Sequence, residues 1–94
     1  MNKIYLISYD LKTPNRDYGP LIEAIKRSPK WLNPLESTWL IVTSETANQI
    51  WSRLGSLITQ SDRLLIIGVT DEFYGWLSKE QWEWIVANKP KSLG

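Results

Sequence analysis

Apolar and β-branched residues dominate the segment KIYLISYD, residues 3–10, which is typical of a β-strand. The alternation between apolar and polar positions is weak there. We therefore expect both faces of this strand to be buried. Successive side chains point to opposite sides, which gives two sets: Ile4 and Leu6 on one face, and Tyr5, Ile7 and Tyr9 on the other.

The next apolar positions, within residues 18–28, recur at helical spacing. Asp17 is the expected N-cap of this helix, and Pro20 is tolerated in its first turn. Pro29 should end it, because the residue before a proline disfavours helical geometry.

Three further strands are predicted, at residues 30–34, 36–43 and 63–69. The first of them is short because Pro34 limits its ladder, and the turn between the first two should contain Asn33 and Pro34. With a second helix between the last two of these strands, the order of elements along the chain is strand, helix, strand, strand, helix, strand.

The second helix is predicted over residues 45–58, with Ser44 as its cap. A C-terminal helix over residues 79–88 follows a capping box formed by Ser78 and Gln81. The intervening residues read as irregular, with a short edge strand at 73–76 as the alternative.

This order predicts an α+β fold, a ferredoxin-like βαββαβ sandwich with a C-terminal helical appendix. Residues 1–88 should form one domain and residues 89–94 a flexible tail. Right-handed crossovers place both main helices on one sheet face. The opposite face is also apolar, so we expect it to pair with a second copy around a two-fold axis, or to be partly covered by the helix at 79–88.

Composition narrows the chemistry and the expected location. The 94 residues include no cysteine and no histidine, which excludes disulfides, thiolate zinc sites and imidazole catalysis. The apolar runs are too short to cross a bilayer, and Asp10 follows Lys3 too closely for a signal peptide. A cytoplasmic protein is therefore expected, with no membrane partner.

Asp10, at the end of the first strand, is the candidate catalytic and metal-binding residue. One carboxylate does little chemistry alone, but a two-fold axis beside it would supply a second. Two facing carboxylates suit Mg²⁺, which prefers oxygen ligands and water. The alternative is that Asp10 only ends its strand and accepts backbone hydrogen bonds from the following loop.

Lys12, Arg16 and Ser37 are candidate contacts for nucleic acid. The first two could hold phosphates beside Asp10, or could be ordinary loop charges. Ser37 could bind a metal-bound water or could support its turn. The six tryptophans invite base stacking, but aromatic residues also fill small cores; Trp31 and Trp76, which flank turns, are the better stacking candidates.

Three segments, YLISYDL, DYGPLIEAI and LESTWLIVT, in this order and spacing, resemble the small CRISPR-associated ferredoxin-fold nucleases and the VapD toxins. The resemblance is closest to the short bacterial proteins known as SinR-like, and it covers residues 3–70. Tyr9 and Asp10 match the family's tyrosine–aspartate pair, whose aspartate is proposed to hold a metal against the dimer mate. Glu36, Ser37 and Trp39 resemble a second family pattern in the third strand.

The resemblance implies a homodimeric, metal-dependent endonuclease of RNA or DNA in antiviral defence. This chain departs from the CRISPR-associated pattern after residue 70, where a helix replaces the strand that pairs with the partner subunit. The name SinR also belongs to an unrelated helix-turn-helix repressor, but this sequence does not show two short helices at the spacing of that motif. Two alternatives stay open: a nucleic-acid-binding scaffold without catalysis, and a protein-interaction module of a defence or toxin–antitoxin system. Fold alone does not choose among them.

Overall fold

A computed structural model of the chain describes residues 2–13 and 15–89. The fold is α+β, with a four-stranded antiparallel sheet of strand order β2-β3-β1-β4. Its strands are β1 (Lys3–Asp10), β2 (Lys30–Leu35), β3 (Thr38–Thr43) and β4 (Arg63–Gly68). The helices are α1 (Gly19–Lys26), α2 (Ala47–Leu54), the 3₁₀ turn η1 (Gly55–Leu57) and α3 (Lys79–Asn88).

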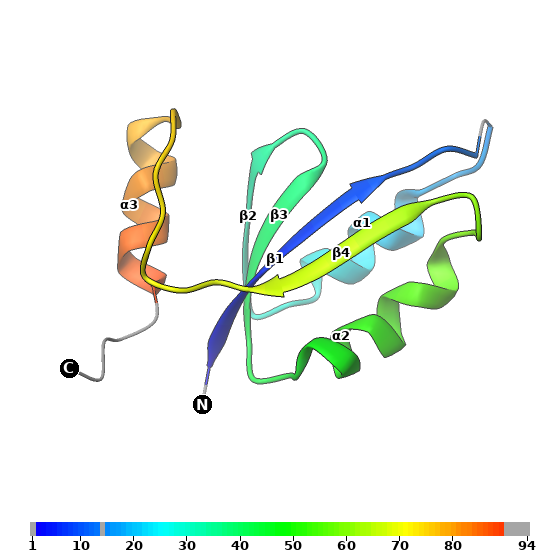
Figure 1. Cartoon of the computed structure of the whole chain (residues 1–94), viewed down its shortest axis with the longest axis horizontal. Coiled ribbons are helices and arrows are strands. Elements are labelled where there is room, and N and C mark those ends of the chain that lie inside the picture. Colours follow the sequence, from blue (N-terminus) through cyan, green and yellow to red (C-terminus); the bar gives the residue numbers. More distant parts are fainter. Residues whose placement is uncertain (1, 14, 90–94) are drawn as a thin grey trace.

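Helices α1 and α2 lie together on one side of the sheet, and α3 stands on the other side (Figure 1). The central strands β1 and β3 are therefore buried on both faces, which explains why their sequences alternate so weakly. The α1–α2 side holds the larger core, formed by residues of both helices and of both central strands: Tyr5, Ile7, Leu21, Ala24, Ile25, Trp39, Ile41, Ile50 and Leu54.

The second core lies between the sheet and α3. Ile85 of α3 is buried against Ile4, Leu40 and Val42. The C-terminal helix thus covers part of the sheet face that the two main helices leave open, which is the alternative that the sequence left open.

The remainder of this second face stays exposed along the edge strand β4. Leu65 and Ile67 pair with Ser8 and Leu6 and share their side of the sheet. Their side chains are 54% and 49% exposed. Within the described part of the chain, α3 therefore leaves an apolar surface on β4 uncovered; we call Leu65 and Ile67 the β4 patch.

The hairpin between β2 and β3 differs from its prediction. The turn is formed by Glu36 and Ser37, and Pro34 lies inside β2 rather than in the turn. The pairing of β2 with β3 is irregular between Leu32 and Leu35, which accommodates the proline. The Asn33 side-chain amide donates to the Leu35 carbonyl on its own strand and to the Thr38 carbonyl across the hairpin.

Two helix caps were also predicted incorrectly. Helix α2 begins after Thr46, not Ser44, and Thr46 forms a reciprocal capping box with Gln49. Helix α1 is preceded by Tyr18 without a side-chain cap, while the carboxylate of Asp17 accepts a hydrogen bond from the Gly19 amide at 2.9 Å. The capping box of Ser78 and Gln81 on α3 is confirmed.

Residues 73–76 form no strand, so the irregular alternative holds for this segment. Of the tail predicted at 89–94, all residues but Lys89 lie outside the described residues.

Candidate functional site

Asp10 is the last residue of β1 and is paired with Arg63 of β4. Strand alternation puts its side chain on the face that carries the β4 patch. The carboxylate is 63% exposed, and its Oδ2 lies 3.2 Å from Nζ of Lys12. An exposed acid paired with one exposed lysine is readily available to a ligand, since such ion pairs are weak in water.

One protomer alone does not offer Asp10 a metal-binding set. The described residues contain no group of three or more acidic, histidine or cysteine side chains that could hold a metal ion. A cation at Asp10 would therefore need oxygen ligands from elsewhere, and a second copy of the chain would supply a second carboxylate.

The other predicted site residues divide into two groups. Ser37 lies beside the end of β1, because its carbonyl accepts a hydrogen bond from the Tyr9 amide at 3.1 Å. Arg16 turns away, donating from Nη2 to the Leu57 carbonyl at 3.4 Å and stacking 5.9 Å from the centre of the Tyr18 ring. The structure thus brings Asp10, Lys12 and Ser37 to one end of the sheet and directs Arg16 toward η1.

The acid that holds the loop after β1 is Asp62, not Asp10. Asp62 is buried, and its Oδ1 accepts hydrogen bonds from the Lys12 amide at 2.8 Å and the Tyr18 hydroxyl at 2.7 Å. Its Oδ2 accepts from the amide and hydroxyl of Thr59, at 2.8 and 3.1 Å. This carboxylate therefore ties the loop at residues 11–18 to the turn that precedes β4.

The surroundings of Asp62 favour its charged form. Burial alone would raise the pKa of this carboxyl group, but hydrogen bonds from the Thr59 amide, the Tyr18 hydroxyl, the Lys12 amide and the Thr59 hydroxyl outweigh it. The pKa of Asp62 is consequently far below its usual range. Asp62 is ionised at neutral pH and holds the segment that carries Lys12 in position.

The sequence alone predicts only that Asp62 lies in a turn. A local signal was present, because a threonine three residues before an aspartate, as in TQSD, suits a side-chain-to-backbone turn. The hydrogen bonds from Lys12 and Tyr18 join residues far apart in the sequence, so no local pattern could have indicated them.

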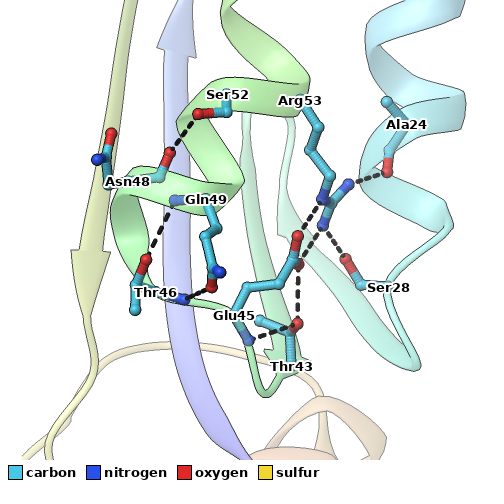
Figure 2. Close-up of polar contacts among 9 residues, drawn as sticks. All are labelled: Ala24, Ser28, Thr43, Glu45, Thr46, Asn48, Gln49, Ser52 and Arg53. Carbon is cyan, nitrogen blue, oxygen red and sulfur yellow. Dashed lines mark hydrogen bonds and ion pairs between the residues drawn. The ribbon is translucent and has the colours of Figure 1, made fainter.

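A second polar cluster joins α1, α2 and the end of β3 (Figure 2). Arg53 donates to both carboxylate oxygens of Glu45, at 2.8 and 3.0 Å, to the Ser28 hydroxyl and to the Ala24 carbonyl. The hydrogen bond from Arg53 lowers the pKa of Glu45; burial opposes this effect, and the Thr43 hydroxyl adds to it. Because every group in this cluster has a partner, its role is to hold the two helices together.

Aromatic side chains are exposed at three places, one of which is Trp51 on α2. Tyr74 and Trp76, on the segment before α3, are almost fully exposed beside a hollow that Phe73 and Trp82 also line. Trp31, on the edge strand β2, is partly exposed beside Lys26.

Searches of protein-family models, curated proteins and solved structures return no match to this chain. Among the helices of the described residues, none has both the length and the apolar character needed to cross a membrane. The site must therefore be interpreted from its own geometry.

Proposed function

We propose that the chain is a ferredoxin-like subunit of a homodimeric, Mg²⁺-dependent endonuclease, with the Asp10 carboxylates of two copies facing each other across the dimer axis. The strand order β2-β3-β1-β4, with α1 and α2 on one face, supports the ferredoxin-like assignment. The observation that carries the functional proposal is the exposed Asp10 carboxylate on the same sheet face as the uncovered β4 patch.

Two copies that bury the β4 patch would bring their Asp10 residues toward a shared axis. Two carboxylates held close together repel each other, and a divalent cation between them relieves the repulsion. Such a cation would supply what a chain without histidine and cysteine lacks, a centre that acidifies water and orients a phosphodiester. Lys12 and Arg63, the cationic neighbours of Asp10, would attract RNA or DNA phosphates.

The dimer is tested by placing charges on the β4 patch. The double variant Leu65→Glu/Ile67→Glu should weaken self-association by at least about 100-fold, since four half-exposed apolar side chains lose their burial. Sedimentation velocity at micromolar concentration should show a dimer for the native chain and a monomer for the variant. Trp51→Glu, which changes a similarly exposed side chain on α2, should leave the dimer intact. A native chain that sediments as a monomer contradicts the proposal.

The acid pair is tested by Asp10→Asn, which is nearly isosteric and removes the charge from both subunits. Without metal, this change should alter the free energy of unfolding by no more than about 0.5 kcal/mol, because the lost ion pair with Lys12 is exposed. Mg²⁺ or Mn²⁺ should raise the melting temperature of the native dimer through linkage and leave that of Asp10→Asn unchanged. Cleavage of RNA or DNA should also disappear.

Asp71→Asn is the matched control, since it removes an exposed carboxylate that lies outside the strands, beyond the opposite end of β4 from Arg63, and it should keep the metal response. If metal raises the melting temperature of neither the native chain nor the variants, the acid pair is not a metal site.

A second candidate function is nucleic-acid binding without catalysis. It is favoured by the ion pair between Lys12 and Asp10, which already neutralises the one carboxylate that each protomer presents at the end of β1. Salt-dependent binding of RNA or DNA that needs no metal and survives Asp10→Asn would support this function over the nuclease.

A further inference from the structure

Three exposed cations gather where α1 ends and the edge strand β2 begins. Lys26 is the last residue of α1, Arg27 follows it, and Lys30 opens β2. Lys26 Nζ lies 5.3 Å from the centre of the Trp31 ring and 6.0 Å from that of Trp39. Lys26 thus places positive charge beside a partly exposed tryptophan, whereas Lys30, which pairs with Val42, points to the opposite side of the sheet, toward α3.

The Trp31 ring is held rather than free. It lies 5.4 Å from the ring of Trp39, tilted by 57°, and Trp39 is itself buried in the larger core. The indole nitrogen of Trp39 donates to the Tyr9 hydroxyl at 3.0 Å, which fixes the supporting ring. Trp31 keeps 41% of its surface exposed, so an immobilised aromatic surface faces solvent at the sheet edge.

The charges around Trp31 are available to a ligand. None of Lys26, Arg27 and Lys30 forms an ion pair within 4.0 Å with any acid in the described part of the chain. Lys30 donates to the neutral Asn88 side chain at 3.3 Å. The nearby carboxylate of Glu45 is already paired with Arg53. This surface therefore combines net positive charge with an exposed ring.

The exposed aromatic group before α3 has the opposite electrostatic surroundings. The segment with Tyr74 and Trp76 is preceded by Asp71 and Glu72, and the helix that follows carries further acids. Phosphates would be repelled there, so aromatic exposure alone does not make that segment a nucleic-acid surface.

We infer that Lys26, Arg27 and Trp31, here named the β2-edge platform, bind single-stranded nucleic acid. A base stacks on the exposed part of Trp31, and the flanking phosphates contact the two cations. Trp31 points to the α1 side of the sheet and Asp10 to the other, so the platform is separate from the acid proposed to bind metal. The inference deepens the proposed function by giving the polymer a second contact, and its ligand class rests on that function.

The test is fluorescence anisotropy with labelled dT12 and rU12 oligonucleotides, without metal, over 25–200 mM NaCl. The native chain should bind at least one of them, and Trp31→Ala should weaken binding roughly 5- to 100-fold, as for the loss of one stacked base. The double variant Lys26→Gln/Arg27→Gln should reduce the slope of log affinity against log salt by about 1.4. Comparing the two oligonucleotides identifies the preferred polymer.

Matched controls separate the platform from general effects. Trp51→Ala removes a tryptophan that is 46% exposed on α2, and Lys79→Gln removes an exposed lysine on α3; both should bind as the native chain does. Trp31→Phe should retain most of the affinity because it keeps an aromatic face. If Trp31→Ala fails to fold, Trp31→Leu keeps apolar contact with Trp39 and tests the same loss.

The inference is overturned if the native chain binds neither oligonucleotide at 25 mM NaCl, if Trp31→Ala and Trp31→Leu bind like the native chain, or if the controls weaken binding equally. The melting and sedimentation experiments on Asp10 and the β4 patch contain no nucleic acid. Failure of the platform and failure of the proposed dimeric metal site are therefore distinguishable.

Discussion

Replacing Arg53 with leucine should lower the free energy of unfolding by about 2–4 kcal/mol. The guanidinium group bridges both oxygens of Glu45 and also donates to the Ser28 hydroxyl and the Ala24 carbonyl (Figure 2). The Ala24 carbonyl, in the last turn of α1, also accepts a hydrogen bond from the Arg27 amide at 3.3 Å. Leucine fills part of the volume but removes the cation beside the Glu45 carboxylate, which keeps only the Thr43 hydroxyl as a side-chain donor, and removes one of the two donors to the Ala24 carbonyl.

Urea denaturation monitored by far-UV circular dichroism measures this loss. Arg53→Lys should be intermediate, because lysine keeps the charge but lacks the planar fork that contacts both carboxylate oxygens. Adding Glu45→Gln to Arg53→Leu should recover part of the stability, since no charge is then left unpaired. An Arg53→Leu protein within about 0.5 kcal/mol of the native chain would show that the cluster is an ordinary surface ion pair.

This cluster also explains why the start of α2 was predicted incorrectly. Ser44 and Thr46 are both good N-cap residues, and residue type alone does not separate them. Two facts favour Thr46: Gln49 stands three residues later and completes the capping box, and Glu45 turns toward Arg53. The second is a tertiary contact, which the sequence pattern does not reveal.

The β2–β3 hairpin shows a similar limit. Asn33 and Pro34 are typical turn residues, and the sequence favoured a turn there. In the structure β2 is an edge strand, where a residue without an amide hydrogen is tolerated. The chain therefore continues through Pro34 and turns at Glu36 and Ser37. Edge position is a property of the whole sheet, so it could not be inferred from these residues alone.

The order of helices and strands was predictable because each depends on local apolar spacing. The place of Asp10 at the end of β1, and the face of the sheet it shares with Leu6, followed from the same spacing. The partial cover that α3 gives this face was foreseen only as an alternative, since the packing of Ile85 on Ile4 joins opposite ends of the chain. Homodimerisation, metal binding and nucleic-acid binding stay predictions.

Asp62→Asn should be among the most disruptive single changes near the candidate site. The native carboxylate accepts four hydrogen bonds, whereas an asparagine side chain offers one oxygen and presents an NH₂ group where the second oxygen accepts. The loop that carries Lys12 then loses most of its connection to the turn before β4, where the hydrogen bond between the Thr13 and Thr59 hydroxyls remains. Because Lys12 is held through its own amide, any phosphate binding that depends on Lys12 should weaken as well.

The pH dependence of the stability lost in Asp62→Asn shows whether Asp62 acts through its charged, hydrogen-bonded carboxylate or only through its packing. The pKa of Asp62 is lowered on folding, so its contribution to stability is complete above the ordinary aspartate value of about 4 and declines as the pH falls toward the folded-state value. Urea denaturation at pH 7, 5, 3 and 2 should show the largest gap between the native chain and Asp62→Asn at pH 7 and 5. The gap should narrow below about pH 4, where the unfolded native chain takes up a proton that the variant cannot.

Asp71→Asn removes an exposed carboxylate that accepts no hydrogen bond from the described residues, and it should follow the native chain at every pH. Glu45 also has a lowered pKa, so the Asp62→Asn variant should itself lose some stability in acid. A gap that stays constant from pH 7 to 2 would mean that Asp62 acts through its shape alone. A gap that narrows below pH 4 would show that its ionised carboxylate holds the loop beside Asp10 in place.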